Sequence, residues 1–453
     1  MGKTDYRYLN QSCKPATKRR GFRLRWKPRS LFSGFQILLL TLLFVTSAIA
    51  LNVKTLPSCL KIVTDKIEGS EVIALDIWVR AGGRNEDYRT AGISHFIEHL
   101  IFKGSKNYKT GEMERLIEEA GGIVNAATSK DFTHFYVVIP KQYFKKALAI
   151  MSDALTNPLF PKEELEKERL VVMEEILRHN SNHQAVLWDL IYAKSFRYHP
   201  YRYPVLGTVQ TVSFLDRDTI IGHYQKYYRG KNITVIATGG LPDNAHRLLA
   251  AAFKDISRLK VKSVRNKESR ITENILFEKE KKISKAYLNV AFSSPPAASF
   301  DSYVMDMIIT ILGNGRNSRL NKEIKENQSL VYDIDIIYPT PIDSNLVVID
   351  ASADPKNLDR ATREIFFQLN LLKTKPVTDY EIKKAINKLE FDYKVNHAEA
   401  KSLASNLGYF ATIADVGYEI NYIQNIKRVS KNDIKRVAAK YFGYYTIGRF
   451  VPE

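Results

Sequence analysis

Three residues, His95, Glu98 and His99, form the pattern H-x-x-E-H inside an apolar, helix-like run from Ala91 to Phe102. Histidines at positions i and i+4 lie on the same face of a helix, close enough to bind one metal ion. The Glu98 carboxylate projects beside that ion, where a base is needed to activate water. H-x-x-E-H is the inverted form of the common zincin motif. It also fits two ordinary histidines on an amphipathic helix, and it leaves a third ligand to be found.

An acidic segment at residues 161–180 could supply that third ligand. Most of its glutamates fit a solvated helix face. Glu168 and Glu175, however, lie two helical turns apart on one face, and the apolar Val171 and Val172 lie between them. A carboxylate on a partly buried face needs a partner, and a bound cation would be one.

The elements that must position these side chains are predicted from residue patterns. Residues 60–63, 71–80, 123–128 and 131–139 read as strands, and residues 142–156 and 161–180 read as helices. Thr90 is the expected N-cap of the motif helix, and Gly104 its stop. A single helix is expected from Phe214 to Tyr228, followed by a strand from Asn232 to Thr238.

The N-terminal segment carries a different signal. Residues 1–30 hold ten Lys and Arg residues against Asp5, and residues 35–50 form an uncharged apolar run that ends in Ala-Ile-Ala. A basic region, an apolar region and an A-x-A site predict a secretory signal peptide over residues 1–50, with a signal anchor as the alternative. The expected location is periplasmic or secreted, in a bacterium, with residues 35–50 as the alternative tether to the inner membrane.

Charge and length limit the remaining classes of function. About half of the net charge of +19 belongs to this N-terminal segment, so the basicity does not indicate a nucleic-acid binder. A chain of 453 residues accommodates two or three domains. We predict an N-terminal domain at 51–255, a polar, basic linker at 256–272 and a C-terminal domain at 273–453.

The second half of the chain loosely repeats the first. Residues 158–165 resemble residues 375–382, and residues 215–228 resemble residues 430–442. The nearly constant offset indicates a duplicated α/β domain. The region that matches the motif helix, about Met307 to Gly315, contains neither His nor Glu, so only the first copy is expected to bind metal.

These motifs together resemble the pitrilysin/insulinase/mitochondrial processing peptidase family of zinc metallopeptidases. The resemblance covers nearly all of the chain after the N-terminal segment. It rests on the H-x-x-E-H motif and on matches at residues 121–128, 166–175, 206–208, 226–228, 232–235, 318–320 and 330–332. It implies an α+β fold with two homologous α/β domains, each a mostly antiparallel sheet packed by helices. Short members of the family close as dimers around a chamber, so one chain would form half of a clamshell.

The resemblance also implies roles for individual residues. His95, His99 and Glu175 would hold one Zn²⁺ per chain, and Glu98 would be the general base. Glu174 is the rival of Glu175, which the spacing from His99 favours. Glu168 would orient a ligand, as metal-bound imidazoles require.

Substrate contacts are implied at two further places. Asn125 and Ala126 would lie on an edge strand that pairs with an extended substrate. Tyr332 matches a family tyrosine that reaches the substrate near the zinc. Lys325 stands where the family often has arginine, and lysine keeps the charge but loses the planar fork. Whether this chain or a partner completes the site therefore stays open.

The sequence thus favours a zinc-dependent endopeptidase that cleaves extended or unfolded peptides. It would act as a homodimer or as a heterodimer with a related subunit. The alternative is a non-catalytic, processing-peptidase-like subunit of a larger assembly.

Overall fold

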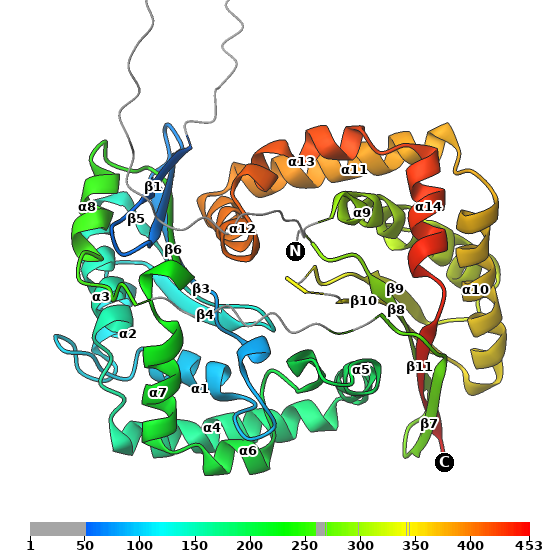
Figure 1. The fold of residues 1–453 in the computed structure, drawn as a ribbon, viewed down its shortest axis with the longest axis horizontal. Coiled ribbons are helices and arrows are strands. Elements are labelled where there is room, and N and C mark those ends of the chain that lie inside the picture. Colours follow the sequence, from blue (N-terminus) through cyan, green and yellow to red (C-terminus); the bar gives the residue numbers. More distant parts are fainter. Residues whose placement is uncertain (1–50, 260–267, 269, 298, 341, 344) are drawn as a thin grey trace, which may run out of the picture.

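The computed structural model describes residues 51–259, 268, 270–297, 299–340, 342–343 and 345–453. Two mixed α/β units lie on opposite sides of the molecule, each built on one sheet (Figure 1). The expected α+β class, with a mostly antiparallel, helix-packed sheet in each half, is confirmed. The predicted signal segment and part of the predicted linker lie outside the described residues. The predicted domain boundaries stay predictions.

The first sheet has the strand order β1-β2-β6-β3-β5-β4. Its strands are β1 (Asn52–Thr55), β2 (Lys61–Lys66), β3 (Val72–Val79), β4 (Ile123–Thr128), β5 (Thr133–Pro140) and β6 (Ile233–Gly239). Neighbouring strands run antiparallel except β2 and β6, which are parallel. Strand β4 therefore lies at an edge of the sheet.

The second sheet has the order β7-β11-β8-β10-β9. Its strands are β7 (Ile275–Lys281), β8 (Ala286–Ser294), β9 (Asp333–Ile337), β10 (Asn345–Ala353) and β11 (Tyr445–Pro452). Again one pair, β7 and β11, is parallel and the others are antiparallel. The five strands follow the same topology as β2-β6-β3-β5-β4, as a duplicated unit requires, and β9 is the counterpart of β4.

Helices surround both sheets. Those of the first half are α1 (Ile93–Leu100), α2 (Glu112–Glu118), α3 (Phe144–Thr156), α4 (Lys162–Ser181), α5 (His183–Ser195), α6 (Val209–Phe214), α7 (Arg217–Tyr227) and α8 (Ala245–Ala252). Those of the second are α9 (Phe300–Gly313), α10 (Leu358–Thr374), α11 (Asp379–Ala398), α12 (Ala400–Ile413), α13 (Gly417–Lys427) and α14 (Lys431–Tyr441). Among the described residues, no helix combines the length and the apolar character that a membrane span needs.

Each half covers one face of the other half's sheet. Helix α12 packs on β3 and β6, whereas α5 packs on β8 and β11 (Figure 1). Strand β3 is therefore buried on both faces. Ile73, Leu75, Ile77 and Val79 face the helices of the first half, and Trp78 faces α12.

Two local predictions were wrong. The helix expected from Phe214 to Tyr228 is broken after Phe214, because Asp216 starts a new helix by accepting a hydrogen bond from the Thr219 N–H. The N-cap of α1 is Gly92 rather than Thr90. Thr90 lies in the preceding turn, where its hydroxyl accepts the N–H of Asp87.

Candidate metal centre

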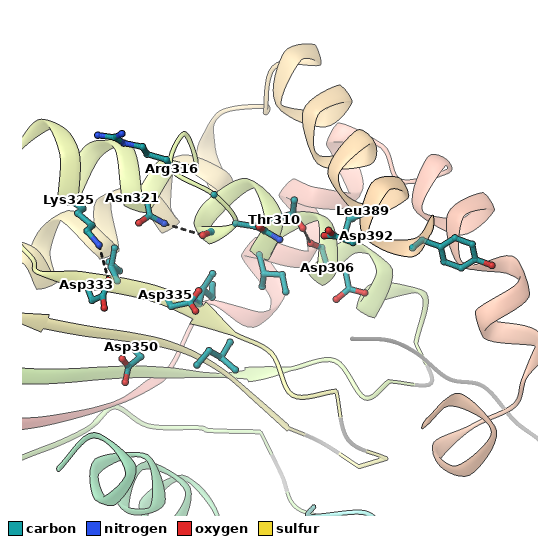
Figure 2. Close-up of a pocket in the computed structure, with 18 of the residues that line it drawn as sticks. Asp306, Thr310, Arg316, Asn321, Lys325, Asp333, Asp335, Asp350, Leu389 and Asp392 are labelled. Carbon is teal, nitrogen blue, oxygen red and sulfur yellow. Dashed lines mark hydrogen bonds and ion pairs between the residues drawn. The ribbon is translucent and has the colours of Figure 1, made fainter. Parts of the chain in front are cut away.

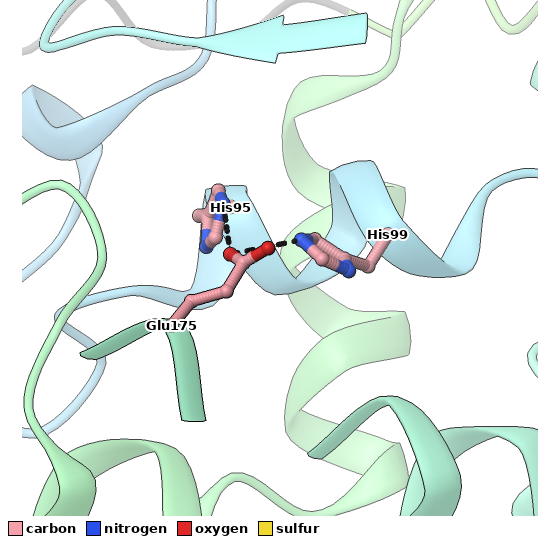
Figure 3. Close-up of side chains that lie close together, drawn as sticks. All are labelled: His95, His99 and Glu175. Atoms are coloured by element: carbon pink, nitrogen blue, oxygen red, sulfur yellow. Dashed lines mark ion pairs between the residues drawn. The ribbon is translucent and has the colours of Figure 1, made fainter. Parts of the chain in front are cut away.

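Helices α1 and α4 pack against each other and bring the predicted metal ligands together. His95 and His99 extend from one face of α1, and Glu175 reaches them from α4 (Figure 3). Oε2 of Glu175 lies 3.6 Å from Nε2 of His95 and 3.5 Å from Nε2 of His99. Glu174, the rival candidate, is exposed. Among the described residues, these three form the one group of at least three candidate ligands.

The donor atoms fit a zinc ion. Zinc prefers imidazole nitrogen and carboxylate oxygen at about 2.0–2.2 Å, and tetrahedral ligands at that range are about 3.4 Å apart. The observed separations of 3.5 and 3.6 Å are close to that value. Burial, and then the neighbouring His99, lower the pKa of His95 to about 3, so its ring is neutral at physiological pH. A neutral imidazole is the form that binds metal.

Glu168 contacts the outer side of the group, as predicted for an orienting acid. Its Oε2 lies 3.0 Å from Nδ1 of His99, and its Oε1 lies 3.0 Å from Nζ of Lys103. An Nδ1–H bonded to the carboxylate leaves the lone pair of His99 on Nε2, which is the atom that faces Glu175. Lys103, which the sequence analysis did not single out, balances the charge of Glu168.

Glu98 projects from α1 between the metal group and the edge strand. Its Oε2 accepts a hydrogen bond from the hydroxyl of Thr128, the last residue of β4. Burial raises the pKa of Glu98, which moves the carboxyl toward the range of a general base. The Thr128 contact was not predicted, although this threonine belongs to the motif that carried the family resemblance.

Asn125 and Ala126 lie on β4, which pairs with β5 along one side and is the edge of the sheet on the other. The side-chain oxygen of Asn125 accepts the N–H of Ala126. Since β4 leaves backbone groups facing outward, an extended peptide could add to it as a further strand.

Lys325 and Tyr332 lie in the second half of the chain. Nζ of Lys325 bonds Oδ1 of Asp333, and Tyr332 is exposed at the start of β9. Among the described residues, neither side chain has a recorded contact with His95, His99 or Glu175.

A cavity of about 810 Å³ lies in the second half of the chain, beside β9 and α9 (Figure 2). Asp306, Asp335, Asp350 and Asp392 are among the acidic residues that line it, together with Lys325. Its helix α9 contains neither His nor Glu, as predicted for this region. The acidic lining was not predicted, because its residues come from separate elements.

Relatives of this chain are named as proteases. An uncharacterized zinc protease of Bacillus subtilis, YmxG, is 25% identical over 79% of this chain and 88% of its own length. The probable β subunit of the mitochondrial processing peptidase of Arabidopsis thaliana is 24% identical over 88% of this chain and 77% of its own.

Solved structures share the fold. A protease from Helicobacter pylori has a TM-score of 0.84 at 24% identity and covers 89% of this chain and 99% of its own. A chain of complex III from Candida albicans has a TM-score of 0.73 at 15% identity, over 88% of this chain and 95% of its own.

Family models match both halves. Residues 61–209 match the insulinase (peptidase family M16) model, and residues 215–389 match the M16 inactive-domain model. With the two-domain fold and relatives named as zinc proteases, these matches show that the chain belongs to the insulinase, or M16, family of peptidases.

Proposed function

We propose that this protein is a zinc-dependent endopeptidase that hydrolyses extended or unfolded peptides, with His95, His99 and Glu175 as ligands and Glu98 as general base. The observation that carries the proposal is the arrangement of α1 and α4. It holds two imidazole nitrogens within 3.6 Å of one carboxylate oxygen, and a second, half-buried carboxylate, that of Glu98, extends from the same helix as the imidazoles. Relatives named zinc proteases support the same assignment.

Zinc bound there would supply a Lewis acid that polarises the scissile carbonyl and lowers the pKa of water. Substrate binding and proton transfer would depend on groups of the protein itself. Strand β4 would bind the substrate in extended form, which excludes folded segments from the site. Glu98 would take the proton of the attacking water on a carboxylate oxygen and return it to the leaving amine. Thr128 restrains that carboxylate and ties it to the substrate strand.

We further infer that the working form is a homodimer, or a heterodimer with a related subunit. Lys325 stands where the family often has arginine and lacks the planar fork of that residue, so a second chain is proposed to complete the substrate clamp. Relatives named as a processing-peptidase subunit and as part of complex III support an assembly. Size exclusion with mass measurement, on the protein alone and with a related subunit, tests this inference.

The experiment for the activity uses a quenched fluorescent peptide and an unfolded protein as substrates. A strong chelator should abolish cleavage, and zinc should restore it. Full activity in metal-free protein would contradict the proposal. Zinc binding without cleavage, in the protein alone and in its assemblies, would instead favour the non-catalytic subunit.

A periplasmic or secreted location, free or tethered to the inner membrane through residues 35–50, stays part of the proposal. Cell fractionation combined with N-terminal sequencing of the mature protein tests it.

A further inference from the structure

A short buried segment precedes the motif helix and holds two charged side chains that reach in different directions. Arg84 and Glu86 lie in and just after the 3₁₀ turn Gly83–Asn85. Their exposed fractions are 8% and 4%. Burial of a charged group is costly unless the group is paired, so both of these side chains need partners.

Glu86 caps α1. The cap residue Gly92 has a φ of 94° and no side chain with which to accept the first N–H groups of the helix. Glu86 accepts them instead, with Oε2 at 2.8 Å from the Gly92 N and Oε1 at 2.9 Å from the Ser94 N. A carboxylate at a helix N-terminus also interacts favourably with the helix dipole. Since His95 follows Ser94 directly, the position of Glu86 helps to set the position of the first proposed ligand.

Arg84 reaches the second half of the chain. Its Nε lies 3.1 Å from Oδ1 of Asp131, and its terminal nitrogen bonds Oδ2 of Asp343. His199 contacts the same Asp343 oxygen at 3.2 Å. The Ile342 N–H in turn donates to Asp131 at 2.9 Å. The guanidinium therefore joins the loop after β4 to a loop of the second half, at a site that is largely excluded from water.

The two side chains are close neighbours along the backbone, because only Asn85 separates Arg84 from Glu86. A shift of Arg84 toward or away from Asp343 must therefore move the residue that caps α1. The exposed ion pair of Lys61 with Asp415, at 3.9 Å, also links the two halves, and neither of its residues belongs to this segment.

We propose that Arg84 and Glu86 form a two-armed positioning segment, through which the contact with Asp343 in the second half holds the zinc helix in its binding geometry. The inference rests on the proposed zinc site, because the role of the segment is to position the helix that carries two of the proposed zinc ligands. The predicted consequence is that zinc affinity depends on a contact far from the ligands, made between the two halves of the chain.

The test compares Asp343→Asn with Asp415→Asn in the full-length protein. Both variants remove one carboxylate from a link between the halves, but only the first touches Arg84. Zinc affinity is measured by competition with a chromophoric chelator, and amide exchange of Gly92 and Ser94 is measured in the metal-free protein. Asp343→Asn should weaken zinc binding about tenfold, the lower end for residues that orient ligands. It should also speed exchange at both amides, whereas Asp415→Asn should change neither by more than about twofold.

A second comparison separates this role from general stability. Glu86→Gln alone should weaken zinc binding, because an amide cannot accept both N–H groups. If both arms act through one segment, adding Asp343→Asn should weaken binding little further, whereas additive losses would overturn the inference. If Asp343→Asn does not fold, Arg84→Lys keeps the charge but loses the planar fork that reaches both Asp131 and Asp343, and the same effects are expected.

The outcomes distinguish this inference from the proposed function. Wild-type protein that binds no zinc would refute the zinc site, while amide exchange would still report on the segment. Wild-type protein that binds zinc, with Asp343→Asn equal to Asp415→Asn in both measurements, would refute the segment alone.

Discussion

Glu168 offers a sharp test of how the metal group is held, because its two oxygens contact two different partners. In the wild type, one carboxylate oxygen of Glu168 lies 3.0 Å from Nδ1 of His99 and the other lies 3.0 Å from Nζ of Lys103. Glu168→Gln replaces one of these acceptor oxygens by an amide NH₂, which is a donor. The substitution also removes the charge that stabilises His99 as a ligand. Residues that orient metal ligands typically contribute tenfold to hundredfold in affinity, or about 1.4–2.8 kcal/mol. We expect a loss in that range for zinc.

The matched control is Glu164→Gln. Glu164 lies one turn earlier on α4, is similarly buried, and pairs with Lys167 as Glu168 pairs with Lys103. Glu164→Gln should leave zinc affinity within about twofold. Lys103→Met should not weaken zinc binding by more than about threefold, because Glu168 keeps its contact with His99.

Competition with a chromophoric chelator measures all three variants, and thermal melts show whether each is folded. Equal zinc affinity for the Glu168 and Glu164 variants would refute the orienting role of Glu168. Loss of affinity in Lys103→Met as large as in Glu168→Gln would show that the ion pair, not the bond to the imidazole, matters.

Three further predictions concern stability and rate. Burial raises the pKa of Glu419 from its ordinary value of 4.5 to about 8, so its contribution to folding is present below pH 4.5 and lost as the pH rises to 8. The wild type should therefore lose on the order of a few kcal/mol of unfolding free energy over this range in urea titrations, and Glu419→Gln should not. Parallel profiles of unfolding free energy against pH for the two proteins would contradict this prediction. A Cβ on Gly408 would lie 2.0 Å from the indole nitrogen of Trp78, whereas one on Gly443 would meet nothing within 4 Å. Gly408→Ala should therefore cost about 1–3 kcal/mol of unfolding free energy in urea titrations, and Gly443→Ala much less; equal stabilities would refute the packing argument. Thr128→Val should lower kcat on a fluorogenic peptide about tenfold with little change in KM, and Thr128→Ser should recover it; a change confined to KM would indicate substrate binding instead.

The sequence was informative where the chemistry is local. The spacing of His95, Glu98 and His99 fixes their common face because a helix has a regular period, and β4 was predicted with the boundaries that the structure has. Glu175 lies beside the histidines in the structure, and the spacing from His99 had favoured it over Glu174.

The features that sequence analysis missed depend on contacts that form only when the chain has folded. Thr90 looked like a cap because it precedes an apolar run, but the fold brings Glu86 back onto the first turn of α1. The packing of α12 on β3 and β6, and of α5 on β8 and β11, was not predicted, because it joins elements that are far apart in the sequence.

The most direct test of the proposed chemistry is the Glu98→Gln variant, with zinc content and peptide cleavage measured on the same preparation. The side chain is almost unchanged in size, and the three proposed ligands are untouched. We predict about one zinc per chain in both wild type and variant, with cleavage in the variant reduced to background. Undiminished cleavage by the variant, or wild-type protein that cleaves peptides without zinc, would contradict the account.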